Sequence, residues 1–146
     1  MGVIYKNVNY DYCAMLIISI LIITTILRRM IKGKVNRSFL EVLVVAWLTI
    51  LFDIWAVHLD NLGVQQVFTK YVAHMGYLVL HSLEMPFYIT YLVAMTDTWH
   101  LFKAKRLLAF LSSFPVLVIT GLILTSPATK WIFYINAQYE YTRGKY

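Results

Sequence analysis

Residues 14–27 read AMLIISILIITTIL and form the centre of the first of several long apolar blocks in this chain. Extended back to Tyr10, the block can cross the roughly 30 Å hydrocarbon core of a bilayer, because a spanning helix takes about 20 residues and somewhat fewer when charged ends snorkel. Such a helix is apolar on every side, whereas a helix of a soluble protein has one apolar face. The block therefore predicts a transmembrane helix.

Three further blocks extend this pattern along the chain. The four expected helices cover about residues 10–27, 39–59, 72–95 and 107–124. Of the 146 residues, 60% are hydrophobic and 14% are charged, which is outside the balance of an ordinary soluble domain. The expected fold class is all-α: a single transmembrane domain over residues 1–146, built as a polytopic bundle of four helices with a short C-terminal β-hairpin.

Basic residues cluster in two of the connections between the blocks. They are Arg28, Arg29, Lys32, Lys34 and Arg37 after the first block, and Lys103, Lys105 and Arg106 after the third. The positive-inside rule makes these connections cytoplasmic, which predicts a multi-pass protein of the cell membrane with both termini and the hairpin outside. Because topology accounts for the net charge of +6, nucleic acid is not an expected partner, and contact of these loops with anionic lipid is the alternative.

Ionisable residues inside the second and third blocks are the candidates for a functional site. An ionisable side chain at membrane depth costs about 2.5–3.5 kcal/mol on insertion scales, so it usually has a partner or a function. At about 100° per residue, one flank of the third helix collects His74, Tyr77, His81, Glu84 and Tyr88. We expect this flank to face the other helices.

Asp53 of the second helix lies at a depth similar to that of His81. We therefore expect these two side chains to form a hydrogen bond, with Glu84 one turn deeper. Pro86 interrupts the hydrogen bonding of the third helix and is either a hinge or a static bend.

Three interpretations of this polar group stay open. It is a structural clamp between two helices, a ligand pocket or pH-sensitive switch, or a metal site. The metal interpretation has weak support, since the chain offers one His-x-x-Glu in the reverse of the usual order. As a ligand-binding or switch site the predicted residues are Asp53, His74, Tyr77, His81, Glu84 and Tyr88, with Pro86 as hinge. No catalytic residue, metal or cofactor is predicted.

Aromatic and β-branched residues follow the fourth block on both sides of a short polar turn at 136–138. Residues 130–135 and 139–144 are therefore expected to pair as a small β-hairpin. It is either a lid over the outer mouth of the bundle or an anchor in the membrane interface, where Trp and Tyr are enriched. Two strands alone are marginally stable, so the hairpin must pack on another element.

The chain also resembles a family, the N-terminal membrane sensor region ahead of GGDEF-type diguanylate cyclase domains, and of some histidine kinases, in Firmicutes. The motifs that carry the resemblance are Arg28-Arg29, Gly33, Asn36, Phe39, Asp53, Pro86-Phe87-Tyr88, Phe133-Tyr134 and Arg143-Gly144. The resemblance implies a sensor with more helices and a cytoplasmic signalling domain after them. This sequence is then expected to be the front part of such a protein, cut after the fourth helix.

Three functions therefore compete. The first is a membrane-embedded sensory input domain of a bacterial signal-transduction protein, without catalytic residues of its own. The second is a small multi-helix transporter in which Glu84 controls proton-coupled flux, and the third is a packing subunit of a membrane complex. The partners considered are the lipid bilayer, an unknown small ligand, a second copy of the chain and the missing C-terminal signalling domain.

Overall fold

The structure is a computed structural model, and it describes residues 8–27, 33–62, 66–97, 106–136 and 141–144, without the side chains of residues 106–112. Four helices make up most of this part of the chain: α1 (Asn9–Leu27), α2 (Lys34–Asn61), α3 (Val67–Met95) and α5 (Arg106–Thr129). The strands β1 (Phe133–Ile135) and β2 (Tyr141–Arg143) follow and pair as an antiparallel hairpin. The expected all-α class with a short C-terminal hairpin is confirmed.

The helices extend beyond the apolar blocks that predict them. α2 begins at Lys34 rather than at Phe39, and α3 begins at Val67 rather than at Val72. With 28 and 29 residues these two helices are each about 42 Å long, more than the hydrocarbon core requires. Hydropathy measures only the apolar run. Polar residues can continue a helix into the interfacial region, so the helices are longer than the predicted spans.

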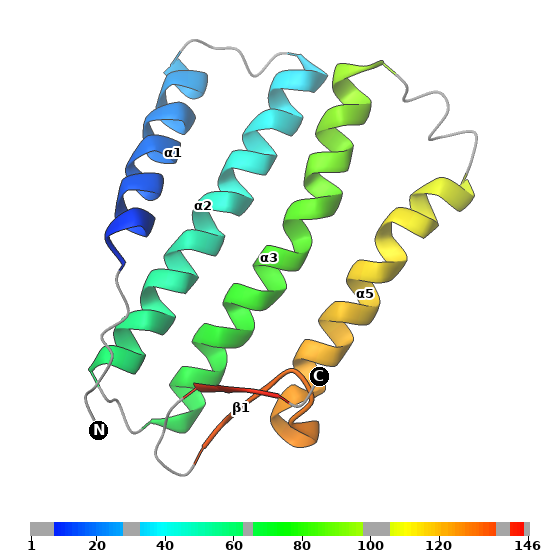
Figure 1. Cartoon of the computed structure of the whole chain (residues 1–146). Coiled ribbons are helices and arrows are strands. Elements are labelled where there is room, and N and C mark those ends of the chain that lie inside the picture. Colours follow the sequence, from blue (N-terminus) through cyan, green and yellow to red (C-terminus); the bar gives the residue numbers. More distant parts are fainter. Residues whose placement is uncertain (1–7, 28–32, 63–65, 98–105, 137–140, 145–146) are drawn as a thin grey trace.

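The helices stand side by side in one row, in the order α1, α2, α3, α5, and each runs antiparallel to the next (Figure 1). Each helix packs on its neighbours in sequence, and within the described residues no contact of similar extent joins α1 to α5. The two middle helices therefore have a neighbour on two sides and an open face on the others. The largest interface, and with it most of the core, lies between α2 and α3.

Close approach of α2 and α3 depends on a glycine. Gly76 of α3 faces the ring of Phe52 in α2, and a Cβ atom at residue 76 would collide with carbons of that ring. Nearer the other end of the same interface, the rings of Phe39 and Tyr91 lie 5.6 Å apart. The α2–α3 interface thus includes both a close backbone approach and an aromatic contact.

Polar contacts join the outer two helices to this central pair. The Trp47 indole of α2 donates a 2.9 Å hydrogen bond to the Ser19 hydroxyl of α1. The hydroxyls of Ser82 in α3 and Thr120 in α5 lie 3.4 Å apart. Both contacts satisfy a polar group between helices, where lipid offers no partner.

Three helices of the described chain, α1, α2 and α3, are long and apolar enough to cross a membrane. In α5 the stretch with described side chains, Ser113–Thr129, is also apolar but shorter, so a crossing by α5 stays a prediction. The start of α1 and the hairpin after α5 lie on the same side of the row, at the lower ends of the helices in Figure 1. Of the predicted cytoplasmic bases, Arg28, Arg29, Lys32, Lys103 and Lys105 lie outside the described residues.

The hairpin begins directly after α5. Lys130 adopts a left-handed backbone conformation (φ 57°), which ends the helix and turns the chain back. The strands are shorter than expected, with Phe133 opposite Arg143, and residues 137–140, which include most of the predicted turn, lie outside the described residues. Gly144 donates a 2.7 Å hydrogen bond to the Ile132 carbonyl at a place where a Cβ atom would collide with the backbone of Trp131.

Candidate functional site

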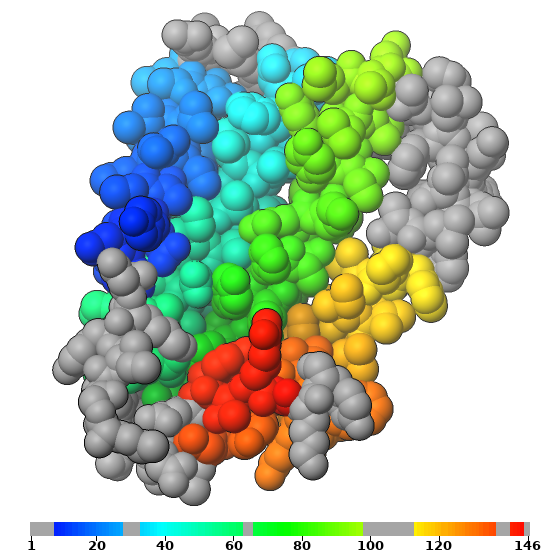
Figure 2. Space-filling view, in the orientation of Figure 1, coloured from blue at the N-terminus to red at the C-terminus, as the bar shows by residue number. Residues whose placement is uncertain are grey.

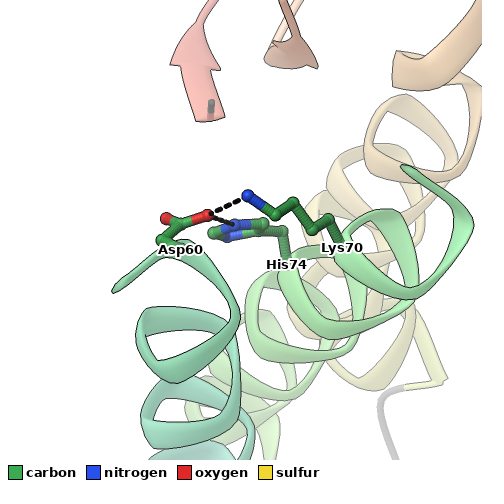
Figure 3. Close-up of polar contacts among 3 residues, drawn as sticks. All are labelled: Asp60, Lys70 and His74. Atoms are coloured by element: carbon green, nitrogen blue, oxygen red, sulfur yellow. Dashed lines mark hydrogen bonds and ion pairs between the residues drawn. The ribbon is translucent and has the colours of Figure 1, made fainter. Parts of the chain in front are cut away.

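A cluster of three ionisable side chains joins the end of α2 to the start of α3, on the side of the row where the hairpin lies. The Asp60 carboxylate, in the last turn of α2, is 3.5 Å from Lys70 Nζ and 3.4 Å from His74 Nε2. Lys70 and His74 are one turn apart on α3, so both side chains reach the same carboxylate oxygen (Figure 3). We refer to Asp60, Lys70 and His74 as the Asp60 cluster.

This cluster is buried although it is near the end of the helices. The side chain of Lys70 is 2% exposed, that of His74 9% and that of Asp60 12%. Lysine and aspartate are almost never this buried unless they are paired, because an isolated charge loses its hydration there. The carboxylate therefore offsets the burial of the Lys70 ammonium.

The hairpin covers the cluster. The His74 ring lies 4.4 Å from the ring of Tyr141 in β2 and 6.2 Å from that of Phe133 in β1, measured between centroids. Phe133 is fully buried and stacks on Tyr141 with centroids 5.5 Å apart. In the space-filling view the hairpin lies over the ends of α3 and α5 (Figure 2). His74 thus contacts both the hairpin and the Asp60 carboxylate.

Two anchors fix the hairpin to the helices. The buried Ser126 hydroxyl of α5 accepts a 2.9 Å hydrogen bond from the Phe133 N–H and donates a 2.8 Å hydrogen bond to the Phe133 carbonyl. The Tyr71 hydroxyl of α3 accepts a 3.2 Å hydrogen bond from the Ile135 N–H. Through these contacts two strands that would be marginal alone are held on α3 and α5.

The structure separates the flank of α3 that the sequence predicts as one site. His74 is buried in the Asp60 cluster, and the Tyr77 ring stacks on that of His81. The side chain of His81, however, is 62% exposed, and Tyr88 is about half exposed. The expectation that the whole flank faces the other helices is wrong for His81 and Tyr88, because α2 and α5 cover only two sides of α3.

His81 pairs within its own helix. Its Nδ1 lies 3.3 Å from a Glu84 oxygen, and its ring stacks on that of Tyr77 with centroids 5.9 Å apart. The expected contact between His81 and Asp53 stays a prediction. Pro86 lies inside an α3 that continues to Met95, and its role as a hinge stays a prediction.

Sequence reasoning placed His74 in the site but missed Asp60 and Lys70. Both lie beyond the apolar blocks, so they were assigned to the connection between the second and third spans. A signal was nevertheless present: a Lys-x-x-x-His spacing at the start of one helix faces an Asp at the end of the preceding one. Among the described residues no group of three histidine, cysteine or acidic side chains is arranged to hold a metal ion.

A groove of about 500 Å³ lies between α1 and α2. Its walls are almost entirely apolar, with His58 at the end nearer the hairpin. The lining residues are Tyr12, Leu51, Phe52, Ile54, Trp55 and His58. Since few polar groups converge there, the groove has less capacity for specific recognition than the Asp60 cluster.

Comparison with known proteins found no family model, no curated protein and no solved structure that matches this chain.

Proposed function

We propose that this chain is the membrane-embedded sensory input domain of a bacterial signal-transduction protein, and that the Asp60 cluster with the hairpin above it is the place where the signal is received. Three long apolar helices support the membrane location. The observation that carries the proposal is that one buried carboxylate ties α2 to α3 while His74 connects it to the hairpin.

Such an arrangement suits an input function because three elements, α2, α3 and the hairpin, meet at the Asp60 cluster. A small ligand or a change at the membrane surface that displaces the hairpin would alter the packing on His74. Because His74 contacts Asp60, the position of α3 relative to α2 would respond. Both helices continue away from the hairpin, and the far end of α3 is about 30 Å from His74. A signalling domain on that side of the membrane would read the change.

The transporter alternative has less support. A proton-coupled carrier needs its membrane carboxylate to line a path that opens to either side. Glu84 instead pairs with His81, whose side chain is 62% exposed at the surface of the described chain. The His81–Glu84 pair is therefore better explained as part of a contact surface.

Hydrogen exchange of the full chain in lipid nanodiscs tests the input proposal. We expect His74→Phe to retain the ring contact with Tyr141 and to lose the contact with Asp60. Faster exchange should then appear at the strands 133–135 and 141–143 and also at the far ends of α2 and α3, at residues 34–38 and 93–97. Thr69→Ala is the matched control, since its exposed side chain hydrogen-bonds Gln66 beside the cluster without joining it.

A change at the far ends that occurs in His74→Phe and not in Thr69→Ala supports the proposal. A change confined to the hairpin and the turns around Asp60 would make the cluster a static clamp and overturn the input role. Asp60→Asn provides a second perturbation of the same link and is expected to have the same long-range pattern.

A further inference from the structure

The exposed residues of α3 follow a heptad pattern from its centre to its end. Between Ala73 and Met95 the exposed positions are His81, Met85, Tyr88, Leu92 and Met95. Their spacings alternate between four and three residues, which places them along one line of an α-helix and is the spacing of the seam of a left-handed coiled coil. We call these five residues the α3 seam.

The α3 seam includes His81, which pairs with the neighbouring Glu84 at the middle of α3. His81 is the central residue of the 29-residue helix Val67–Met95, and Glu84 lies less than one turn further along. Both contribute to the surface, with 62% and 34% of their side chains exposed. At that depth a bilayer presents only hydrocarbon, so lipid offers no hydrogen-bond partner to either group. Their mutual contact at 3.3 Å uses one imidazole nitrogen and one carboxylate oxygen, so the second nitrogen and the second oxygen favour a further polar partner in the membrane.

A second copy of the chain meets this requirement through its own symmetry. Two copies inserted with the same topology have their α3 helices parallel and at the same depth, so a two-fold axis between them brings each seam against itself. His81 of one copy then lies beside His81 and Glu84 of the other. Because an imidazole and a carboxylate are complementary, two His81–Glu84 pairs can share their hydrogen bonds across the axis.

The remaining seam residues suit the same contact. Met85, Tyr88, Leu92 and Met95 are large apolar or amphipathic side chains that pack as knobs between parallel helices. A polar pair among apolar seam residues is also the arrangement that fixes register in coiled coils. We propose that the α3 seam is the surface through which two copies of this chain pair in the membrane, with His81 and Glu84 setting the register. This inference does not depend on the input function.

Disulfide cross-linking of the full chain in lipid vesicles tests the pairing. The exposed native thiol is first removed with Cys13→Ser. Single Met85→Cys and Leu92→Cys substitutions then place one thiol on the seam, while Leu117→Cys is the matched control near the middle of α5, where the side chain is 66% exposed against 64% for Met85. Under mild oxidation we expect both seam variants to form covalent dimers at least tenfold faster than Leu117→Cys.

Equal cross-linking at the seam and at residue 117, or none at either seam position, overturns the proposal. The second result is also the one expected if lipid or helices of another protein cover the seam. Should either seam variant fail to reach the membrane, Met95→Cys on the same seam replaces it.

The register-setting role has its own measurement in the Met85→Cys background. Adding Glu84→Gln is expected to slow cross-linking several-fold, because the carboxylate that the imidazoles share is neutralised. Adding Glu41→Gln, which neutralises a carboxylate near the start of α2, should leave the cross-linking rate unchanged. An unchanged rate with Glu84→Gln contradicts the role assigned to the His81–Glu84 pair.

Discussion

Lys70 keeps its ammonium 3.5 Å from the Asp60 carboxylate while only 2% of its side chain is exposed. A charge removed from water to this extent is tolerated because a partner of opposite charge is within contact distance. His74 shares the same carboxylate oxygen, so Asp60 is the common partner of the cluster. The stability of the α2–α3 contact at this end should therefore depend more on Asp60 than on either basic residue.

Asp60→Asn is expected to lower the free energy of unfolding by about 3–5 kcal/mol, because the Lys70 ammonium is left buried without its countercharge. The double substitution Asp60→Asn with Lys70→Met removes both charges and should recover most of this loss. Unfolding of the purified chain in mixed micelles measures both values.

Glu41→Gln is the control for this comparison. Its carboxylate also pairs with a base, Arg37 at 3.2 Å, but the Arg37 side chain is 75% exposed. The expected loss is at most about 0.5 kcal/mol, as for exposed pairs one turn apart on a helix. Similar losses for Asp60→Asn and Glu41→Gln would mean that burial does not govern the energy of the Asp60 cluster.

Among the elements, α2 and α3 determine the architecture, since their interface is the largest and the outer helices are added to it. Gly76 allows the two helices to approach, because the Phe52 ring occupies the space in which a side chain of residue 76 would lie. Small residues at such contacts are typical of membrane helices, where packing replaces the hydrophobic effect as the force between helices.

Gly76→Ala is accordingly expected to destabilise the chain by about 1–3 kcal/mol through overpacking, with α2 and α3 forced apart. Gly121→Ala in α5 is the matched control, since nothing beyond the adjacent residues and backbone of α5 itself lies within 4 Å of its added methyl group. That control should be neutral or gain up to about 1 kcal/mol, because alanine is favoured over glycine inside a helix.

The same unfolding measurement separates these two glycine variants. The addition of Phe52→Leu to Gly76→Ala should restore part of the stability by removing ring atoms from the collision. If Gly76→Ala behaves like Gly121→Ala, the close approach at Gly76 does not limit the α2–α3 spacing.

At the scale of the whole molecule, the start of α1 and the hairpin after α5 lie on the same side of the row, because each described helix runs antiparallel to the next (Figure 1). If the predicted basic connections are cytoplasmic, this side, with the hairpin and the Asp60 cluster, faces outward. An outward site fits the reception of an external signal.

A reporter that is active only in the cytoplasm distinguishes the two orientations. Fused after Tyr146 it should be silent, and fused to a chain shortened after Arg37 it should be active. The reverse pattern would place the Asp60 cluster on the cytoplasmic side, and the proposed input would then come from inside the cell.

The apolar blocks alone determined that this chain is helical and that three of its helices are long and apolar enough to cross a membrane. Helix formation there is local: backbone groups in hydrocarbon have no solvent partner, so a run of about 20 apolar residues forms a helix whatever its neighbours are. The hairpin was predictable for a similar reason, since aromatic and β-branched residues flank a short polar turn. His74 was found because an ionisable residue stands out in an apolar block.

Only the tertiary structure decided which polar residues meet. The sequence predicts the same inward orientation for His74, His81 and Tyr88, because they share a helix face. The helices form a row instead of enclosing that face, so His74 lies under the hairpin while His81 and Tyr88 remain exposed. Asp60 and Lys70 come together across a connection whose path hydropathy does not encode. The apolar pattern of the sequence shows where each helix forms. The contacts between helices depend on how far each helix extends and on which of its sides a neighbour covers.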